Sequence, residues 1–330
     1  MATGDERWAR PTATLIAGGK SNLTFELTCT AGNLILRRPP RGDLLPSAHD
    51  MVREARVQRA LADSEVPVAS IVLVDLEGSL LGTPCYVMSK VDGYVIRDAM
   101  PDGYVETADD CRGIGDALID TLIAIHAVDP TAVGLTDFGR PEGFLYRQIR
   151  RWSDQWSRTA IANSDEMVML AHLLVEKMPP ATKSTIVHGD FRLDNCVMDK
   201  RDPHRVAAVL DWELSTVGDP LTDLGMFLFY WREPGECQHT LVPSVATQPG
   251  FPSRRYLAQR YSEQTGVSLE SIDYYLAFAN FKFACIVQGI AARVTAGSMA
   301  GQDFGGLEAS VADFARTGLA ILDSAAASRG

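Results

Sequence analysis

Short apolar runs dominate the first 90 residues of this chain. They cover residues 15–28, where a turn of small residues divides the run in two, and residues 33–39, 66–74 and 84–88. Runs of this length, bounded by Gly, Pro and other turn residues, are typical of β-strands. A helix is expected from Pro46 to about Ala62, with Ser47 as its N-cap. The pattern therefore predicts a small N-terminal sheet accompanied by one helix.

From residue 107 onward the apolar positions recur at the helical period. Thr107 begins a variant of the capping box, and the segment 107–128 has one apolar face, made by Ile114, Leu118, Leu122 and Ile125. Further helices are expected over residues 144–156, 168–177, 251–265 and 274–295, and after Asp219-Pro220 as N-cap and first helical residue. A small sheet followed by many helices is an α+β pattern.

Composition narrows the class of protein. The 330 residues are 46% hydrophobic and 22% charged, which is typical of a soluble globular protein and is enough for two lobes. The net charge of −11 argues against binding to nucleic acid or an anionic membrane, and weakly suits a cationic substrate. Six scattered cysteines and an N-terminus without a secretory signal predict reduced thiols in a cytoplasmic protein. The apolar runs 224–231 and 274–292 are too short or too interrupted to span a bilayer, and are predicted to be buried helices.

The most informative chemistry lies in His188-Gly189-Asp190 and in the later Asn195 and Asp211. Phosphoryl transfer from ATP requires a carboxylate that orients or deprotonates the attacking hydroxyl, and oxygen ligands that hold Mg²⁺ on the phosphates. Asp190 is the candidate for the first task, and Asn195 and Asp211 are the candidates for the second. A capped turn at His188 and Asp190 and a strand-end turn at Asp211 would explain the same residues without catalysis.

The spacing brings the two candidate metal ligands together. An apolar run at 186–187 leads into the loop, where Gly189 allows a sharp turn. The next predicted strands are residues 196–198 and 206–210. A hairpin of this size places Asn195 and Asp211 at its open end, where an amide oxygen and a carboxylate suit a hard cation.

These residues resemble the signature of the aminoglycoside phosphotransferase and choline kinase family: His-Gly-Asp, four residues, Asn and then a metal-binding Asp. The chain is similar in particular to the kinase-like domains of acyl-CoA dehydrogenase family members ten and eleven, over roughly residues 15–293. The resemblance implies a bilobal protein-kinase-like fold that uses ATP and Mg²⁺. It implies a nucleotide-binding lobe over residues 1–88, a hinge over 89–93 and a catalytic and acceptor-binding lobe over 94–330.

Three segments are expected to contact the nucleotide. The turn between the first two strands is rich in small residues, and the resemblance assigns Gly19, Ser21 and Asn22 to phosphate contact. The hinge offers backbone groups to adenine, which places Met88 and Val91 beside the base. The third segment is a basic strand end.

Arg37, in that third segment, stands where kinases carry a lysine that pairs with the phosphates and with a helix glutamate. A guanidinium is wider and planar, so the two side chains are not interchangeable at such a site. We expect Arg37 to contact the phosphates and Glu54 to be its partner. A solvent-exposed basic strand end and an exposed helix glutamate are the alternative.

The expected reaction is transfer of the γ-phosphoryl group of ATP to a hydroxyl of a small molecule. Candidate acceptor contacts are Arg192, Lys282 and Arg293, of which Lys282 is unusual because it stands in the apolar run 278–284. If these cations face the pocket, the acceptor carries an anionic group, such as a hydroxy acid or a hydroxyacyl-CoA. The resembled acyl-CoA dehydrogenase-linked kinases, which act on hydroxyacyl-CoA, agree with this. If the cations reach solvent or a nearby carboxylate, they indicate nothing about the acceptor.

Other functions stay open. The chain could be an aminoglycoside 3′-type phosphotransferase, or a nucleotide-binding pseudokinase without turnover, as the arginine and the degenerate loop would allow. A metallohydrolase with His188 and Asp190 as ligands lacks further histidines at ligand spacing. Asp223 is expected to brace the catalytic loop and not to bind metal. The sequence leaves the acceptor, the number of Mg²⁺ ions and the oligomeric state undetermined.

Overall fold

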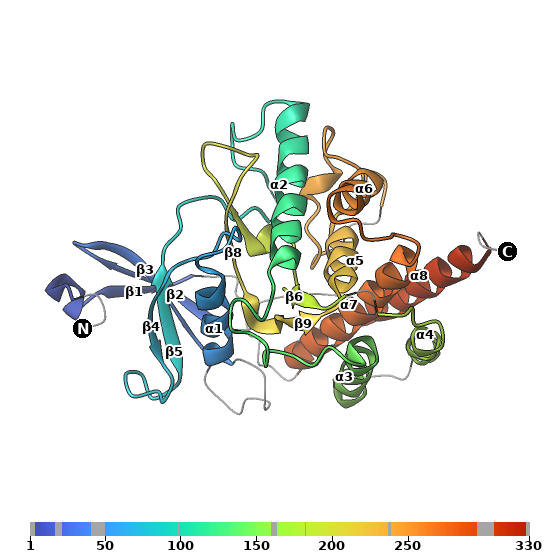
Figure 1. Cartoon of the computed structure of the whole chain (residues 1–330), viewed down its shortest axis with the longest axis horizontal. Helices are drawn as coiled ribbons and strands as arrows, with labels where there is room; N and C mark the ends of the chain where they lie inside the picture. Colours follow the sequence, from blue (N-terminus) through green and yellow to red (C-terminus); the bar gives the residue numbers. More distant parts are fainter. Residues whose placement is uncertain are drawn as a thin grey trace.

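The computed structural model describes residues 4–16, 22–40, 50–97, 99–159, 164–181, 183–236, 239–295 and 307–327. Figure 1 shows two parts: a sheet with one helix at the N-terminal end, and a larger, mainly helical part that contains the C-terminus. This is the α+β arrangement that the pattern of apolar positions predicts.

The N-terminal sheet is antiparallel throughout, with the strand order β1-β2-β3-β5-β4. Its strands are β1 (Thr12–Leu15), β2 (Leu23–Cys29), β3 (Gly32–Arg38), β4 (Ile71–Asp75) and β5 (Cys85–Ser89). Helix α1 (Met51–Leu61) packs on β4 and β5. Six buried side chains of this lobe form a small core, Ile35, Met51, Ala55, Ala69, Tyr86 and Met88, while Val57, Leu61 and Val66 belong to the larger core.

Helix α1 begins later than the sequence predicts. Its N-cap is Asp50, whose carboxylate accepts a hydrogen bond of 3.0 Å from the Arg53 amide. Ser47, the predicted cap, lies outside the described residues. Asp and Ser cap helices about equally well, so the pattern alone could not choose between them.

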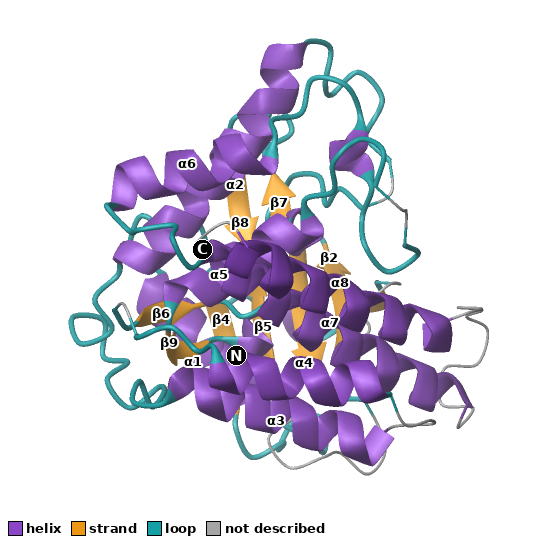
Figure 2. Ribbon diagram, turned by 90° about the vertical axis from the view of Figure 1, so that its right-hand side faces the viewer, coloured by secondary structure: helices purple, strands orange, loops and turns teal. Residues whose placement is uncertain are grey.

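Helices make up most of the C-terminal part. They are α2 (Ala108–Ala127), α3 (Phe144–Thr159), α4 (Asp165–Glu176), α5 (Pro220–Tyr230), α6 (Arg254–Thr265), α7 (Ile272–Thr295) and α8 (Leu307–Ala327). The capping box at Thr107 and the Asp219-Pro220 start of α5 are confirmed. Helix α8 is not among the predicted helices; it packs along α7 and against α4 (Figure 2).

Helix α7 is the centre of this part and contacts α8, α5 and α3. By length and composition it is the one helix of the described ranges that could cross a membrane, and 78% of its most apolar window is buried inside the protein. A helix that is apolar on all sides and covered by other helices belongs to a core. The structure therefore confirms the buried helix predicted over 274–292.

Two short antiparallel pairs lie between the sheet and the helices (Figure 1). Strand β6 (Thr185–Val187) pairs with β9 (Thr216–Gly218), and β7 (Cys196–Met198) pairs with β8 (Val206–Val209). Short 3-10 helices are η1 (Glu6–Ala9), η2 (Leu193–Asn195), η3 (Trp212–Leu214) and η4 (Val245–Thr247). After β5, Tyr94 and Met198 exchange backbone hydrogen bonds of 2.8 Å in both directions. The chain thus enters the C-terminal part beside β7.

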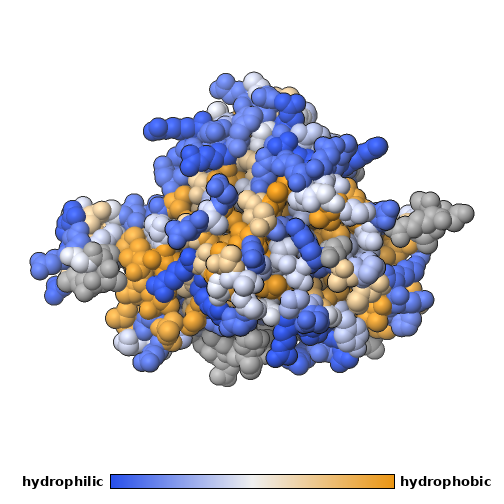
Figure 3. Space-filling view, viewed as in Figure 1, coloured by the Kyte–Doolittle hydropathy of each residue, from blue (hydrophilic) through white to orange (hydrophobic). Residues whose placement is uncertain are grey.

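The two parts differ at the surface. In Figure 3 hydrophilic residues cover the region over α2 and α6, while hydrophobic surface gathers over the N-terminal sheet. The exposed large hydrophobic residues of that lobe include Leu15, Ile16, Leu76, Leu80 and Leu81. Leu76, Leu80 and Leu81 lie in the turn between β4 and β5, and Leu15 and Ile16 lie at the end of β1, so these exposed apolar side chains belong to the ends of strands.

Candidate active site

The loop that carries Asp190 follows β6, whose three residues are all buried. Gly189 has a φ of +86°, and a Cβ at this position would lie 2.6 Å from the Leu214 carbonyl oxygen. Only glycine satisfies both conditions without strain. The sharp turn predicted at Gly189 is therefore present, and it directs Asp190 out of the strand.

Asp223, on α5, braces the backbone of this loop. Its carboxylate accepts hydrogen bonds from the His188 amide at 2.5 Å and the Gly189 amide at 2.8 Å. Burial alone would raise the pKa of Asp223, but His126 and the loop groups bonded to it outweigh this and lower the pKa. The carboxylate thus stays ionised inside the core, as the expected bracing role requires.

Both ring nitrogens of His188 are hydrogen-bonded to the backbone. Its Nε2 lies 2.8 Å from the Leu210 carbonyl oxygen, and its Nδ1 accepts a hydrogen bond of 3.2 Å from the Asp190 amide. Because both ring nitrogens have backbone partners, the imidazole has none left for a metal ion. This geometry argues against the metallohydrolase alternative.

The carboxylate of Asp190 is held on both oxygens. Oδ1 accepts a hydrogen bond of 2.9 Å from the Tyr230 hydroxyl, and Oδ2 accepts one of 3.0 Å from Asn195 Nδ2. Arg192 Nε lies 3.4 Å from Oδ2. Burial raises the pKa of Tyr230 well above its ordinary value, and the charge of Asp190 adds to this, so the phenol remains a donor. Each carboxylate oxygen keeps a further lone pair for an acceptor hydroxyl.

Asn195 and Asp211 lie at the same end of the β7–β8 hairpin, as predicted. Cys196 pairs with Val209 in the ladder, and the Leu210 amide donates to the Asn195 carbonyl at 2.8 Å. Asp211 has left-handed backbone angles, with φ 63° and ψ 60°. A non-glycine residue in this region is strained, and such strain is concentrated at functional sites.

These residues fit a magnesium ion. Asn195 Nδ2 also donates to the Asp190 backbone carbonyl at 2.8 Å, so Oδ1 is the amide atom left for a cation. The Asp211 side chain is 31% exposed and can present a carboxylate oxygen to the same space. No cluster of three His, Cys, Asp or Glu exists within the described ranges. Mg²⁺ binds through few protein oxygens together with substrate phosphates, so a large protein cage is not expected.

Arg37 joins the two lobes. Its guanidinium lies 2.9 Å from Glu54 Oε1 and 2.9 Å from Asp211 Oδ1. Both Arg37 and Glu54 are buried, at 7% and 0% exposure. Burial alone would lower the pKa of Arg37, but the neighbouring carboxylates raise it well above its ordinary value. The predicted pairing with Glu54 is therefore present, and Asp211 is an additional partner.

The remaining predicted nucleotide contacts lie around this pair or outside the described residues. Asn22, the residue before β2, is buried, and its Nδ2 donates to Glu213 Oε2 at 3.1 Å, two positions after Asp211. Met88 is buried in β5 and Val91 packs partly against the same core. Gly19 and Ser21 lie outside the described residues. The nucleotide roles of these five residues stay predictions.

Two of the three candidate acceptor residues contact the loop of Asp190, and the third is on a different part of α7. Arg192 is near Asp190, whereas Arg293 lies at the end of α7 and interacts electrostatically with Glu213. Lys282 is 6% exposed, and its ammonium donates to the Gly189 carbonyl. The structure does not gather the three cations into one cluster, so their contact with an acceptor stays a prediction.

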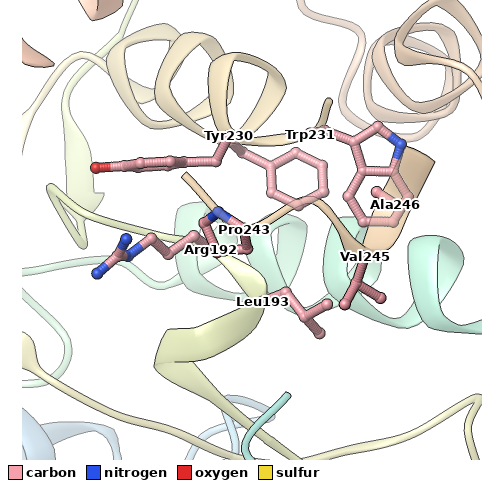
Figure 4. A pocket seen from close by; sticks show the side chains of 8 residues that line it. Arg192, Leu193, Tyr230, Trp231, Pro243, Val245 and Ala246 are labelled. Carbon is pink, nitrogen blue, oxygen red and sulfur yellow. The ribbon is translucent and has the colours of Figure 1, made fainter. Parts of the chain in front are cut away.

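Figure 4 shows a mainly apolar pocket, two of whose lining residues, Tyr230 and Arg192, contact Asp190. It is lined by Arg192, Leu193, Phe227, Tyr230, Trp231, Pro243, Val245 and Ala246. The Arg192 guanidinium lies 4.9 Å from the centroid of the Tyr230 ring, and in Figure 4 the polar ends of both side chains point the same way. The pocket thus combines hydrophobic walls with one cation beside the candidate base.

The sequence did not single out Tyr230 as a functional residue. It is the last residue of α5, in the run 224–231 that the pattern predicts to be a buried helix. The one available signal was its hydroxyl, because a buried tyrosine needs a hydrogen-bond partner.

Comparisons with known proteins agree with this geometry. A family model described as "Phosphotransferase enzyme family" matches residues 12–255. Acyl-CoA dehydrogenase family member 11 of Homo sapiens is 34% identical over 321 residues, which cover 96% of this chain and 41% of that protein. The chain therefore spans about two fifths of the length of this relative.

Solved structures show the same fold. A protein of Ralstonia eutropha JMP134, described as a "putative aminoglycoside phosphotransferase", is 30% identical with a TM-score of 0.81, over 96% of this chain and 93% of that one. A thermostable mutant of aminoglycoside phosphotransferase APH(4)-Ia, in a ternary complex with AMP-PNP and hygromycin B, is 15% identical with a TM-score of 0.60, over 95% of this chain and 96% of that one. These likenesses confirm the protein-kinase-like fold.

Proposed function

Because this chain belongs to the phosphotransferase enzyme family, we propose that it is an ATP-dependent kinase acting on a hydroxyl group of a small molecule. The observation that carries the proposal is the arrangement of Asp190, Asn195 and Asp211 around one loop and one hairpin end. Phosphoryl transfer requires a base and oxygen ligands for a metal ion. Asp190 is the candidate base, and Asn195 and Asp211 beside it are the candidate ligands.

The chemistry follows from these positions. The acceptor hydroxyl donates its proton to Asp190 as its oxygen bonds to the γ-phosphorus, and the bond from that phosphorus to the bridging oxygen breaks, releasing ADP. Tyr230 and Asn195 hold the carboxylate toward the acceptor. Asn195 and Asp211 would hold Mg²⁺, which when bound neutralises phosphate charge. Catalysis of this kind is mostly positioning and electrostatics.

We further propose an acceptor with an apolar part and an anionic group, such as a hydroxy acid or a hydroxyacyl-CoA. The pocket beside Asp190 supports the apolar part, because its described lining is aromatic and aliphatic apart from Arg192, whose Nε lies 3.4 Å from Asp190 and 3.1 Å from Asp194. Polycationic aminoglycosides are matched by acidic pockets, since each cation needs a carboxylate or carbonyl partner. The relatives that carry acyl-CoA dehydrogenase names are consistent with an acyl acceptor.

ADP release in the presence of ATP and Mg²⁺ tests the proposal. The acceptors offered should be a series of hydroxy acids, their coenzyme A esters, and kanamycin-type aminoglycosides. We expect product with hydroxy acids or their esters, confirmed by mass spectrometry as a phosphate ester. Product from aminoglycosides alone would overturn the acceptor class. ATP binding without a phosphorylated product from any of them would favour the pseudokinase alternative.

A further inference from the structure

Lys282 is a charged residue in the middle of the core helix α7. It lies between Phe281 and Phe283, and its side chain is 6% exposed. Burial lowers the pKa of its ammonium, although the carboxylates of Asp190 and Asp223 oppose this effect. Removing an ammonium group from water is costly unless it gains a specific partner. A lysine at this position therefore requires a structural or catalytic reason.

The partner of this ammonium is the catalytic loop. Lys282 Nζ donates to the Gly189 carbonyl, and it lies 5.4 Å from the centroid of the Trp152 ring, within the range of a cation–π contact. The amide of Gly189 is bonded at 2.8 Å by Asp223. The peptide groups of this glycine are thus hydrogen-bonded by two buried charged side chains, the carboxylate of Asp223 on α5 and the ammonium of Lys282 on α7. Asp190 is the next residue.

The surroundings of Lys282 differ from those of Asp190. The cavity beside Lys282 is lined by residues of α3, α5, α7, β6 and β9 and by Gly189 and Leu214, and it includes Gln148, Arg151, Trp152, Thr216 and Asp223. Neither Asp190 nor Arg192 lines it, and Lys282 does not line the apolar pocket beside the base. The hydrogen bond from Lys282 to the site is made to the Gly189 backbone, and the Asp190 carboxylate acts on the ammonium through its charge alone.

We propose that Lys282 is a positioning residue that fixes the Gly189 peptide, and through it the direction of the Asp190 carboxylate, and that it does not bind the acceptor. The inference rests on the proposed phosphoryl transfer, because the carboxylate needs this precision only if it receives the acceptor proton. Under this proposal α7, which begins about 80 residues after Asp190, helps to fix the orientation of the Asp190 carboxylate.

The test compares Lys282→Met with Gln288→Met. Gln288 is also buried in α7, and its Nε2 donates to a backbone carbonyl, that of Thr159, at 2.8 Å. Both variants remove a buried polar contact from the same helix, but only the first reaches the catalytic loop. We expect Lys282→Met to lower kcat by about tenfold or more, since a small misplacement of a reacting group is costly. The KM values for ATP and acceptor should change by less than about twofold, because no binding contact is lost.

Hydrogen exchange supplies a second measurement that does not depend on activity. Peptides covering residues 186–196 should exchange faster in Lys282→Met and at the wild-type rate in Gln288→Met. A raised acceptor KM with unchanged kcat, or unchanged exchange in this loop, would overturn the proposal. If Lys282→Met does not fold, Lys282→Arg is judged by the same criteria, since a planar guanidinium cannot reproduce the ammonium contact. Absence of turnover in the wild-type protein would contradict the proposed function, while the exchange comparison would still decide the contact.

Discussion

The two carboxylates of the site are held in different ways. Asp190 receives hydrogen bonds from Tyr230 and Asn195, and two buried charged residues of α5 and α7 bind the backbone of its loop. All of these partners belong to the C-terminal part. Asp211 has a left-handed backbone and pairs with Arg37, which comes from the N-terminal sheet.

This difference divides the site into an acceptor side, which is Asp190 with its partners, and a metal side, which is Asp211 with Arg37. The acceptor side is fixed within one lobe, where several buried polar groups satisfy one another and rigidify the loop. The metal side depends on how the two lobes are placed, because one partner of Asp211 is carried by β3. A displacement of the sheet would move Arg37 away from Asp211 and would leave the bonds to Asp190 intact. Variants of each half should therefore fail in different ways.

The largest expected effect is on the link between the lobes. Arg37→Ala leaves Glu54 buried without a cation, which should lower the free energy of unfolding by about 3–5 kcal/mol, as measured by denaturant titration. It should also weaken ATP binding. Arg38→Ala is the matched control, because Arg38 is only partly buried and its Nε bonds the Pro39 carbonyl. Equal effects of the two variants on ATP binding would contradict the prediction that Arg37 contacts the phosphates.

Asp190→Asn tests the acceptor side. Loss of the proton acceptor should lower kcat by at least about 100-fold, the scale of general base catalysis. ATP affinity, measured by calorimetry, should stay within about twofold because the loop is braced independently of this carboxylate. Asp120→Asn is a suitable control, since Asp120 pairs with Arg260 at the surface. Near-normal turnover of Asp190→Asn would contradict the assignment of the base.

Asp211→Ala tests the metal side. It removes one charged oxygen ligand, so ATP affinity in the presence of Mg²⁺ should fall by about 10- to 100-fold. Affinity measured without Mg²⁺ should change much less, and this comparison within one variant is the control. If the Mg²⁺ dependence of ATP binding is unchanged, the cation is held elsewhere.

The parts of the site that the sequence predicts are local. Asp190 and Asn195 share one loop, and Asp211 follows the hairpin that begins at Asn195. Strand periodicity and one glycine with positive φ are sufficient to bring them together. The pairing of Arg37 with Glu54 is predicted from the resemblance, because kinases pair a strand lysine at this position with a helix glutamate.

The parts that the sequence does not predict depend on long-range packing. Tyr230 and Lys282 contact the loop from helices that begin far later in the chain, and the apolar run around each one explains its burial equally well. Periodicity identifies which residues are buried, but it does not identify which neighbour a buried hydroxyl or ammonium meets. Helix α8 is a similar case, since its reason to form is its packing on α7.

Tyr230→Phe is the most specific test of the acceptor side, with the smallest expected effect. The variant removes only the hydroxyl that bonds Asp190 at 2.9 Å and keeps the ring under Arg192. Losing one hydrogen bond to a charged group should lower kcat by roughly fivefold to tenfold, less than the loss of the base itself. ATP affinity should not change, because no lobe contact is lost.

The control for this variant is Tyr275→Phe. Tyr275 is also buried and donates to a carboxylate, Asp219 Oδ2, at 2.7 Å, at the N-cap of α5 and not in the catalytic loop. Both variants should therefore lose similar stability, whereas only Tyr230→Phe should lose turnover. If kcat falls equally in both, the hydroxyl of Tyr230 acts through general stability. In that case Asn195 and the braced loop are sufficient to orient Asp190.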